Sequence, residues 1–405
     1  MDTQPPRPPH TQPRPQNGPR EQQPSRPVMQ PQQNAQGGAP MGNQNGGQKG
    51  ASSHGMQLFY SLVDQVVKEN ASDLHLAEGR QPSMRVSGFL VPMLQAPKLT
   101  RDDMLSIVDT ILLPEFKQEF IKEKEIDFSY SHGETARFRG NGFVTQGRLA
   151  IALRLIPAHI RTLDELRLPP ILETFARKEQ GFFLCVGPVG QGKSTTLASL
   201  IEMINTERME HIVSIEDPIE YVFTPKKSII DQREVGIDTQ SFASALKHAL
   251  RQDVNVVLVG EMRDLETISM AVTAAETGHL VFSTLHTNNA SQTIDRIIDV
   301  FPSEQQGQIR LQLASSLSGI FSQRLIPRIS GGLVPAYELL INNSAVSNLI
   351  REKRTHEINT VIETSAQQGM IDLNRSLVEL VRQGEISIEN AYAHSLNPKV
   401  LERMM

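Results

Sequence analysis

The sequence has one cysteine, Cys185, among its 405 residues. A single cysteine excludes a disulfide framework and any cysteine-rich zinc site, and it fits a reducing compartment. Long apolar runs are also missing. No stretch approaches the roughly 18 residues that a membrane-spanning helix needs, and the chain start has no apolar run that could serve as a signal peptide. We therefore expect a cytoplasmic protein without direct membrane insertion, which works at a membrane only if partners recruit it.

The first 55 residues are poor in residues that form a core. They hold 11 of the 25 prolines, 11 glutamines and 8 glycines, and Val28 is their only Val, Leu, Ile or Phe. Such a segment buries too little apolar surface to offset the entropy of ordering it, so we predict a disordered tail over residues 1–55. Without the tail, 35 Lys and Arg stand against 43 Asp and Glu, a formal charge of −8. No nucleic-acid partner is expected from that charge.

Residues 56–160 have the pattern of a small α+β domain. Apolar residues at three-to-four spacing predict a helix over residues 56–68, and Thr100 with Asp103 has the form of a capping box that opens a helix near residues 101–112. We expect strands in these segments: a pair within 73–92, then 127–130, 136–146 and 149–156. A linker near residues 157–168 leads into the second domain, residues 161–405.

Beyond Gln180 the pattern changes to short continuous apolar runs, each followed by a segment long enough for a helix. The runs are 182–186, 212–215, 256–259 and 280–285. Strands without apolar/polar alternation are buried on both faces, as in parallel sheets covered by helices. This pattern predicts a doubly wound α/β domain. Ligands of such domains bind at the carboxyl ends of the strands, so the residues just after each run are the candidate site.

The first run is followed by the phosphate-binding pattern G-x-x-x-x-G-K-[ST]. Here it reads Gly187-Pro188-Val189-Gly190-Gln191-Gly192-Lys193-Ser194. The glycines let backbone N–H groups turn toward phosphate oxygens, Lys193 places a cation against the β and γ phosphates, and Ser194 offers a hydroxyl to Mg²⁺. We expect a helix from Thr195 onward, whose positive end faces the same anion. ATP with Mg²⁺ is the expected ligand, and a glycine-rich turn without a ligand is the alternative.

Acidic residues follow the second and third runs. The two segments are Glu216-Asp217-Pro218-Ile219-Glu220 and Gly260-Glu261-Met262-Arg263-Asp264. Carboxylates at the ends of two strands near a phosphate loop can hold Mg²⁺, and they can orient or deprotonate the water that attacks the γ phosphate. For Glu220 and Asp264, a solvated or helix-starting acid is the alternative.

Two histidines frame the fourth run. His286 follows the run at a strand's carboxyl end, where an imidazole can contact a γ phosphate or Glu261 and report hydrolysis to the helices behind it. His279 precedes the run. A purely structural role is the alternative for both histidines.

Three arginines of the smaller domain are candidates for contact with phosphate. Arg137 and Arg139 are two residues apart on one predicted strand and therefore project from the same face, while Arg154 comes from the next strand. Arginines that arrive when domains or subunits close can neutralise the charge that develops on the γ phosphate. A solvated arginine face with weak surface ion pairs is the alternative.

Taken in order, these motifs strongly resemble those of the PilT-type ATPases of type IV pili, which belong to the secretion ATPase superfamily. The resemblance runs from about Met56 to the end of the chain. Besides the phosphate loop it rests on Ala71-Ser72-Asp73-Leu74-His75-Leu76, Ile215 through Glu220, Val259 through Thr267, and Thr277-Gly278-His279 through His286-Thr287-Asn288.

The resemblance implies a homohexameric ring of two-domain subunits, each with a PAS-like N-terminal domain and a RecA-like ATPase domain that ends in a helical part. It implies ATP hydrolysis between these domains, coupled to pilus retraction and twitching motility, and a pilus platform protein at the inner membrane as partner. It also implies residue roles: Glu261 as the catalytic glutamate, an acidic box of Glu216, Asp217 and Glu220, a histidine box of His279 and His286, and phosphate-facing Arg137, Arg139 and Arg154.

The retraction subclass is favoured over assembly and type II secretion ATPases, because those relatives usually carry a larger additional N-terminal domain and often a four-cysteine zinc insertion. One feature departs from the retraction pattern. Retraction ATPases commonly have a helix reading Ala-Ile-Arg-Asn-Leu-Ile-Arg-Glu, whereas Ser347 stands here where the first arginine is usual. An accessory retraction motor or a related secretion-apparatus ATPase therefore stays open. A non-hydrolysing nucleotide-binding scaffold is disfavoured by the presence of Lys193, Ser194 and Glu261.

Overall fold

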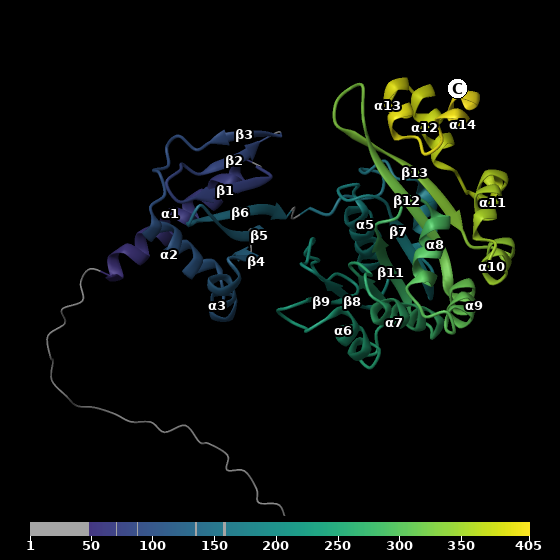
Figure 1. Ribbon diagram of the computed structural model, residues 1–405, viewed down its shortest axis with the longest axis horizontal. Coiled ribbons are helices and arrows are strands. Elements are labelled where there is room, and N and C mark those ends of the chain that lie inside the picture. Colours follow the sequence, from purple (N-terminus) through teal and green to yellow (C-terminus); the bar gives the residue numbers. More distant parts are fainter. Residues whose placement is uncertain (1–47, 70, 87, 134–135, 157–158) are drawn as a thin grey trace, which may run out of the picture. The chain divides into compact units, whose positions relative to one another are not determined.

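The computed structural model describes residues 48–69, 71–86, 88–133, 136–156 and 159–405. These residues belong to one compact unit, which contains two separate β-sheets (Figure 1). Most of the predicted tail, residues 1–47, lies outside the described residues, and so do residues 157 and 158 of the predicted linker. Among the described residues, no helix combines the length and apolar character needed to cross a membrane.

The first sheet is antiparallel and has the strand order β3-β2-β1-β6-β5-β4. Its strands are β1 (Asp73–Ala77), β2 (Ser83–Val86), β3 (Phe89–Pro92), β4 (Glu125–His132), β5 (Ala136–Thr145) and β6 (Arg148–Ile156). The pair predicted within residues 73–92 is in fact three strands. The chain reverses once more at Gly88, whose φ of +88° is the left-handed conformation that glycine adopts without strain.

Three helices accompany this sheet: α1 (Gln48–Lys68), α2 (Arg101–Ile111) and α3 (Pro114–Glu123). The predicted capping box is confirmed, since the Thr100 side chain accepts from the Asp103 N–H and Asp103 accepts from the Thr100 N–H. Helix α1 begins eight residues before the predicted start, so the tail prediction is wrong from Gln48 to Gly55. A Cβ on Gly55 would lie 2.6 Å from the Ser106 Cβ, so this glycine lets α1 approach α2 closely. Apolar periodicity does not reveal such a contact.

The second sheet has the strand order β13-β12-β7-β11-β10-β8-β9. Its strands are β7 (Gly181–Val186), β8 (His211–Glu216), β9 (Ile229–Glu234), β10 (Val256–Val259), β11 (Leu280–Leu285), β12 (Leu317–Pro327) and β13 (Leu333–Ile341). All four predicted runs are strands, and they form the parallel centre of the sheet. The parallel strand β9, the parallel strand β12 and the antiparallel β13 complete the sheet.

Helices cover both faces of the second sheet, which confirms the doubly wound α/β fold. On β7, Phe182 and Leu184 pack with the cluster under α6 to α9, whereas Phe183 and Cys185 pack with α4 and α5 on the other face. The covering helices are α4 (Glu173–Ala176), α5 (Lys193–Glu207), α6 (Phe242–Ala249), α7 (Leu265–Glu276), α8 (Ala290–Asp299) and α9 (Gln306–Ser316). Burial on both faces explains why β7 shows no alternation in sequence.

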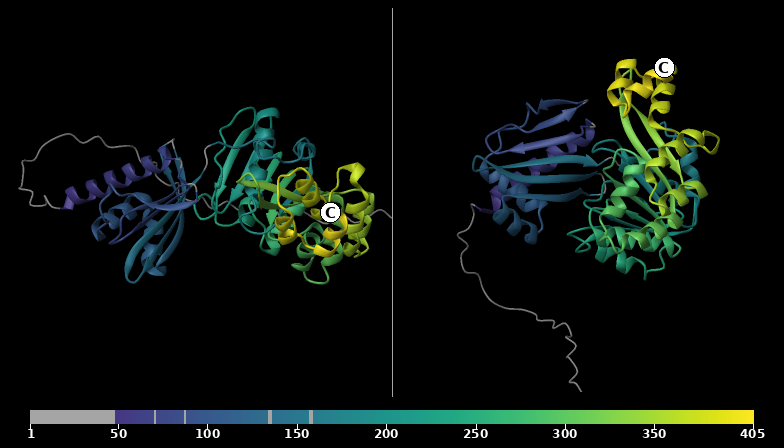
Figure 2. Two further views of the ribbon diagram at one scale, coloured as in Figure 1. Left: turned by 90° about the horizontal axis from the view of Figure 1, so that it is seen from above. Right: turned by 45° about the vertical axis from the view of Figure 1, so that its right-hand side comes forward.

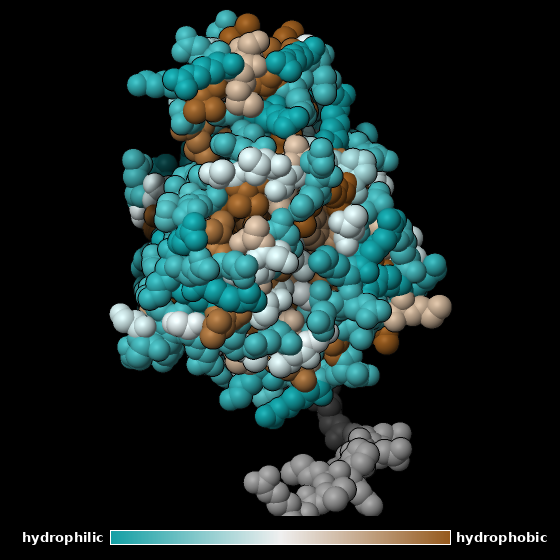
Figure 3. Space-filling view, turned by 90° about the vertical axis from the view of Figure 1, so that its right-hand side faces the viewer, coloured by the Kyte–Doolittle hydropathy of each residue, from teal (hydrophilic) through white to brown (hydrophobic). Residues whose placement is uncertain are grey.

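The C-terminal part is helical, with α10 (Ser344–Arg351), α11 (Ile358–Thr364), α12 (Leu373–Arg382), α13 (Ile388–His394) and α14 (Pro398–Met404). Figures 1 and 2 show α12 to α14 gathered beside β12 and β13. Their core includes Ile326 of β12 and Val334 and Ala336 of β13. On the face drawn in Figure 3, hydrophobic residues form small groups separated by hydrophilic ones.

Glu338 on β13 is a buried carboxyl group, 7% exposed. Its Oε1 accepts the backbone N–H of Ala290 at the start of α8, 2.7 Å away, and burial raises the pKa of Glu338 to about 7. A carboxyl group whose pKa is higher in the folded state favours folding most strongly below its unfolded pKa. That contribution is lost as the pH rises through the folded pKa.

We therefore expect the wild type to lose stability relative to Glu338→Gln as the pH rises from about 4.5 to about 7, by up to about 3 kcal/mol. Chemical unfolding of both proteins at a series of pH values measures this difference. Glu385→Gln serves as a control of opposite sign, because Arg328 lowers the pKa of Glu385 and its stabilisation is lost as the pH falls. A difference between wild type and Glu338→Gln that does not change with pH would contradict the prediction.

Candidate active site

A cavity of about 530 Å³ opens where the four central strands end. Its walls come from the phosphate loop between β7 and α5, from residues 216–223 after β8, from residues 258–263 at the end of β10, and from Thr284 and His286 at the end of β11. Arg139 of β5 and Leu325 of β12 complete the lining. The volume falls in the range of small-molecule sites, and the location is the one predicted from the strand pattern.

The phosphate loop has backbone conformations that glycine adopts without strain and other residues rarely adopt. Gly187, Gly190 and Gly192 have φ values of +142°, +76° and +79°. A Cβ on Gly187 would lie 2.4 Å from the backbone oxygen of Gln323, so a larger residue does not fit there. Helix α5 begins at Lys193, two residues earlier than predicted, and its N-terminal backbone faces the cavity with the positive end of the helix dipole.

The loop is also tied to the neighbouring strand β12. The side-chain oxygen of Gln191 accepts the N–H of Leu325 (2.7 Å), and the side-chain amide of Gln323 donates to the backbone oxygen of Gln191 (2.8 Å). The hydroxyl of Thr196 in α5 donates to the Gln323 side-chain oxygen (2.6 Å). Sequence reasoning missed these links, because β12 itself was not anticipated.

Lys193 lies at the centre of a chain of polar contacts. Its Nζ donates to the backbone oxygens of Gly187 (2.9 Å) and Pro188 (2.8 Å) and lies 3.3 Å from His286 Nδ1. The other ring nitrogen, Nε2, is 3.7 Å from Glu261 Oε2. Burial lowers the pKa of Lys193. Burial and the Lys193 ammonium lower the pKa of His286, which favours a neutral imidazole.

Glu261 faces both His286 and Arg263. Its Oε1 is 2.6 Å from Arg263 Nη2, and its side chain is 16% exposed, so a carboxylate oxygen remains accessible from the cavity. The Glu261 side chain is thus oriented by two partners, as a water-positioning or general-base group must be. Asp264, three residues on, caps helix α7 through the Thr267 N–H, which confirms the helix-starting alternative for that acid.

The three acids of the predicted acidic box all line the cavity but differ in environment. Glu216 is 7% exposed and accepts from the Ser214 hydroxyl (2.8 Å) and the Glu220 N–H (3.2 Å). Burial raises the pKa of Glu216 to about 7. Burial and the nearby Glu261 carboxylate raise the pKa of Asp217. The Tyr221 hydroxyl lies 2.8 Å from that of Thr195, a contact between the acidic segment and α5 that the sequence did not predict.

The structure separates the three candidate arginines. Arg139 alone lines the cavity. Arg137 forms an ion pair with Glu234 of β9, with 2.6 Å between Arg137 Nη2 and Glu234 Oε2. Arg154 pairs with Asp73 of β1 at 2.9 Å, and its side chain is 73% exposed. Strand register puts all three on one face of the sheet, because Arg139 lies directly opposite Arg154.

His279 lies away from this cavity in the same chain. It precedes β11, at the amino end of the parallel strands, and its Nδ1 is 3.0 Å from the backbone oxygen of Ala274. Gly187 and Pro188 direct their carbonyls to Lys193 and do not line the cavity, whereas the predicted loop residues Val189 to Thr195 do line it. The proposed roles of all these residues remain predictions.

The residues present fit a nucleoside triphosphate with a divalent cation. The glycine backbone leaves room close to the loop, Lys193 supplies a buried cation, and the start of α5 supplies N–H donors for phosphate oxygens. Ser194 places a hydroxyl in the same cavity, with carboxylates of Glu216, Asp217, Glu220 and Glu261 nearby. A doubly wound sheet with this loop defines the protein as a P-loop nucleoside triphosphatase.

Comparisons with known proteins agree with this class. The family model described as "Type II/IV secretion system protein" matches residues 52–332. The type IV pilus retraction ATPase PilT of Pseudomonas aeruginosa is 44% identical over 324 residues, which are 80% of this chain and 94% of PilT. The type IV pilus ATPase PilU of the same organism is 39% identical over 351 residues, which are 86% of this chain and 91% of PilU.

A solved structure shows the same similarity to PilT. The crystal structure of the pilus retraction motor PilT with bound ADP has a TM-score of 0.80 and 46% identity, and the match covers 85% of this chain and 99% of that one. The chain belongs to the type II/IV secretion system protein family. The predicted resemblance to PilT-type ATPases, the α/β fold and the ATPase class are thereby confirmed.

Proposed function

We propose that this chain is the ATP-driven motor that retracts a type IV pilus and so powers twitching motility, working as a homohexameric ring. The observation that carries the proposal is the 44% identity to PilT over 94% of PilT's length. The assembled cavity supports it, because Lys193, Ser194 and Glu261 all line one space. A retraction motor needs ATP turnover, and that space holds groups suited to binding a triphosphate and to orienting a water molecule.

In the proposed reaction, the phosphate loop and the start of α5 bind the triphosphate, and Lys193 neutralises charge on its β and γ phosphates. Ser194 would hold Mg²⁺, with Asp217 and Glu220 facing the same cavity. The ion supplies charge neutralisation along the phosphates when it is bound. Glu261 orients or deprotonates the attacking water, and His286 responds to the state of Glu261 and Lys193. Arg139 adds a positive charge from the N-terminal sheet.

We further propose a location at the inner face of the cytoplasmic membrane, through recruitment by the pilus platform protein. We also propose a domain boundary near residue 160, between the end of β6 at Ile156 and the first helical turn at Pro170. In this arrangement the ATPase domain spans residues 161–405, and the PAS-like domain, predicted for residues 56–160, also includes the start of α1 from Gln48.

A second candidate function is an accessory retraction motor or a related secretion-apparatus ATPase, and Ser347 is the observation that favours it. The Ser347 hydroxyl donates to the Ala314 oxygen (2.9 Å) and lies 3.1 Å from Asn342 Oδ1, so this position of α10 faces α9 and carries no charge. The retraction pattern has an arginine at this place.

The two functions are separated by deleting the gene and following single fluorescently labelled pili. We expect long pili that extend and do not retract, because assembly proceeds without the opposing motor. Retraction should return with the wild-type gene and not with Lys193→Ala. Pili that still retract with reduced force or frequency would favour the accessory role, and a cell without pili would contradict retraction and indicate assembly.

A further inference from the structure

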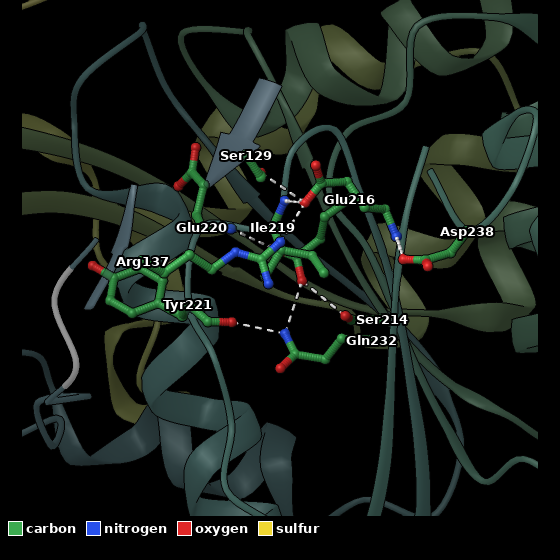
Figure 4. Close-up of polar contacts among 10 residues, drawn as sticks. Ser129, Arg137, Ser214, Glu216, Ile219, Glu220, Tyr221, Gln232 and Asp238 are labelled. Carbon is green, nitrogen blue, oxygen red and sulfur yellow. Dashed lines mark hydrogen bonds and ion pairs between the residues drawn. The ribbon is translucent and has the colours of Figure 1, made fainter. Parts of the chain in front are cut away.

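Glu234 is a buried carboxylate outside the cavity that receives donors from the first sheet and from the acidic segment after β8. It ends β9, its side chain is 4% exposed, and its Oε2 accepts from Arg137 Nη2 (2.6 Å), the Ser129 hydroxyl (3.0 Å) and the backbone N–H of Ile219 (3.2 Å) (Figure 4). Arg137 and Ser129 belong to β5 and β4 of the first sheet. Ile219 belongs to the acidic segment that lines the cavity. A single oxygen atom therefore joins the N-terminal sheet to that segment.

The acidic segment depends on β9 for its conformation. Gln232 lies two residues before Glu234, on the same face of the strand. Its side-chain amide donates to the backbone oxygen of Tyr221 (2.7 Å), and its side-chain oxygen accepts from the Phe223 N–H (2.8 Å). The register of β8 and β9 places Glu234 directly beside Glu216. The Val235 N–H donates to the backbone oxygen of Glu216 at 2.9 Å. Displacement of Glu234 must therefore move the segment between Glu216 and Phe223.

Glu234 itself is held in a fixed turn. Its own N–H donates to Asp238 Oδ2 at 2.8 Å (Figure 4). Its backbone oxygen accepts the Asp238 N–H, also at 2.8 Å. The carboxylate is thus presented to Arg137 on a rigid support. Removing Arg137 would leave a buried carboxylate with only neutral donors, and such a group relaxes toward other partners or solvent.

Arg137 and Arg139 occupy one face of β5 and reach different targets. Arg139 lines the nucleotide cavity, and Arg137 stops at Glu234. We infer that Arg137 is a positioning residue: through Glu234 and the Ile219 N–H it couples the placement of the N-terminal sheet to the placement of Asp217 and Glu220 at the cavity. It does not contact the nucleotide. This inference deepens the proposed ATPase mechanism and rests on it.

The test is a double-mutant cycle in the full-length protein with Arg137→Gln, Glu234→Gln and both together. Steady-state hydrolysis gives kcat and KM for ATP, and a fluorescent ADP analogue gives a dissociation constant that does not depend on turnover. We expect each single variant to lower kcat about tenfold while KM and the ADP affinity stay within about twofold. The double variant should lose no more than the worse single one, because both remove the same contact.

A conservative variant and a matched pair provide the controls. Arg137→Lys keeps the charge and should recover part of kcat. Arg328 pairs with Glu385 at 2.7 Å and is about as exposed as Arg137, 22% against 23%, but Glu385 lies between α12 and α13 and not beside the acidic segment. Arg328→Gln should leave kcat unchanged.

Three results would overturn the inference. Wild-type kcat in both single variants would show that the pair does not matter for turnover. Effects that multiply in the double variant would show that the residues act separately. A large loss of ADP affinity in Arg137→Gln would place this arginine on the nucleotide. If the wild type itself fails to hydrolyse ATP, the proposed function fails instead, and the cycle is then read from unfolding midpoints, where the same non-additivity is expected.

Discussion

Lys193→Ala is expected to reduce ATP turnover by at least about 10²-fold and to weaken nucleotide binding. The reason is the position of its ammonium group. Lys193 is 7% exposed and held by two loop carbonyls at the start of α5, which fixes its positive charge beside the phosphate loop. Alanine removes the charge and leaves the loop backbone in place.

Magnesium-dependent release of inorganic phosphate by the purified protein measures the effect, and titration with a fluorescent ADP analogue measures the affinity. Lys226→Ala is the matched control, because Lys226 forms a surface ion pair with Glu202 outside the active-site cavity. Full turnover in Lys193→Ala, with an unchanged unfolding midpoint, would refute the phosphate-loop assignment.

Glu261→Gln should keep nucleotide binding and lower the hydrolysis rate by about 10²- to 10⁴-fold. Glutamine has nearly the same shape and retains an oxygen toward Arg263, so the cavity wall is preserved. It cannot accept a proton as carboxylate does, and it presents no negative charge to His286 or to an attacking water. This variant distinguishes two roles for Glu261: loss of a binding group would weaken nucleotide affinity, whereas loss of a group that acts on water would lower the hydrolysis rate alone.

The decisive measurement is a single-turnover experiment with ATP in complex with the variant, which separates binding from hydrolysis. Glu266→Gln, an exposed acid in the first turn of α7, should behave as wild type. An unchanged rate in Glu261→Gln would remove Glu261 from the role of base or water-positioning group. The acids Asp217 and Glu220 would then be tested in the same way.

The centre of the fold was predictable because burial on both faces leaves a direct trace in sequence. The runs that became β7, β8, β10 and β11 contain almost no polar residues. Strand β9 reads Ile229-Ile230-Asp231-Gln232-Arg233-Glu234 and lies at the sheet edge, where one side meets solvent. Strand β12 carries Ser322 and Gln323, which are buried only because they bind the backbone and side chains of neighbouring segments. The sequences of β9 and β12 therefore lack the continuous apolar run that predicts a buried strand.

The candidate site was predictable in outline, since loops at the carboxyl ends of parallel strands must meet. His279 shows the same rule in reverse: it precedes its strand, so the rule places it at the other end, and only family resemblance drew it into the site. The sequence could not predict which of the candidate arginines lines the cavity. Arg137 and Arg139 have equivalent positions on one strand face, and what distinguishes them is whether Glu234 or the cavity lies within reach, which depends on a contact between residues 97 positions apart in the chain.

The hairpin of β12 and β13 has a mechanical consequence. Gln323 holds the phosphate loop, and Ile326, three residues along the same strand, is part of the core under α12 to α14. Covalent bonds of an extended strand hardly stretch, so tension applied to the C-terminal helices reaches the loop along a single short span of backbone. A force on the C-terminal helices therefore also changes how the phosphate loop binds phosphate.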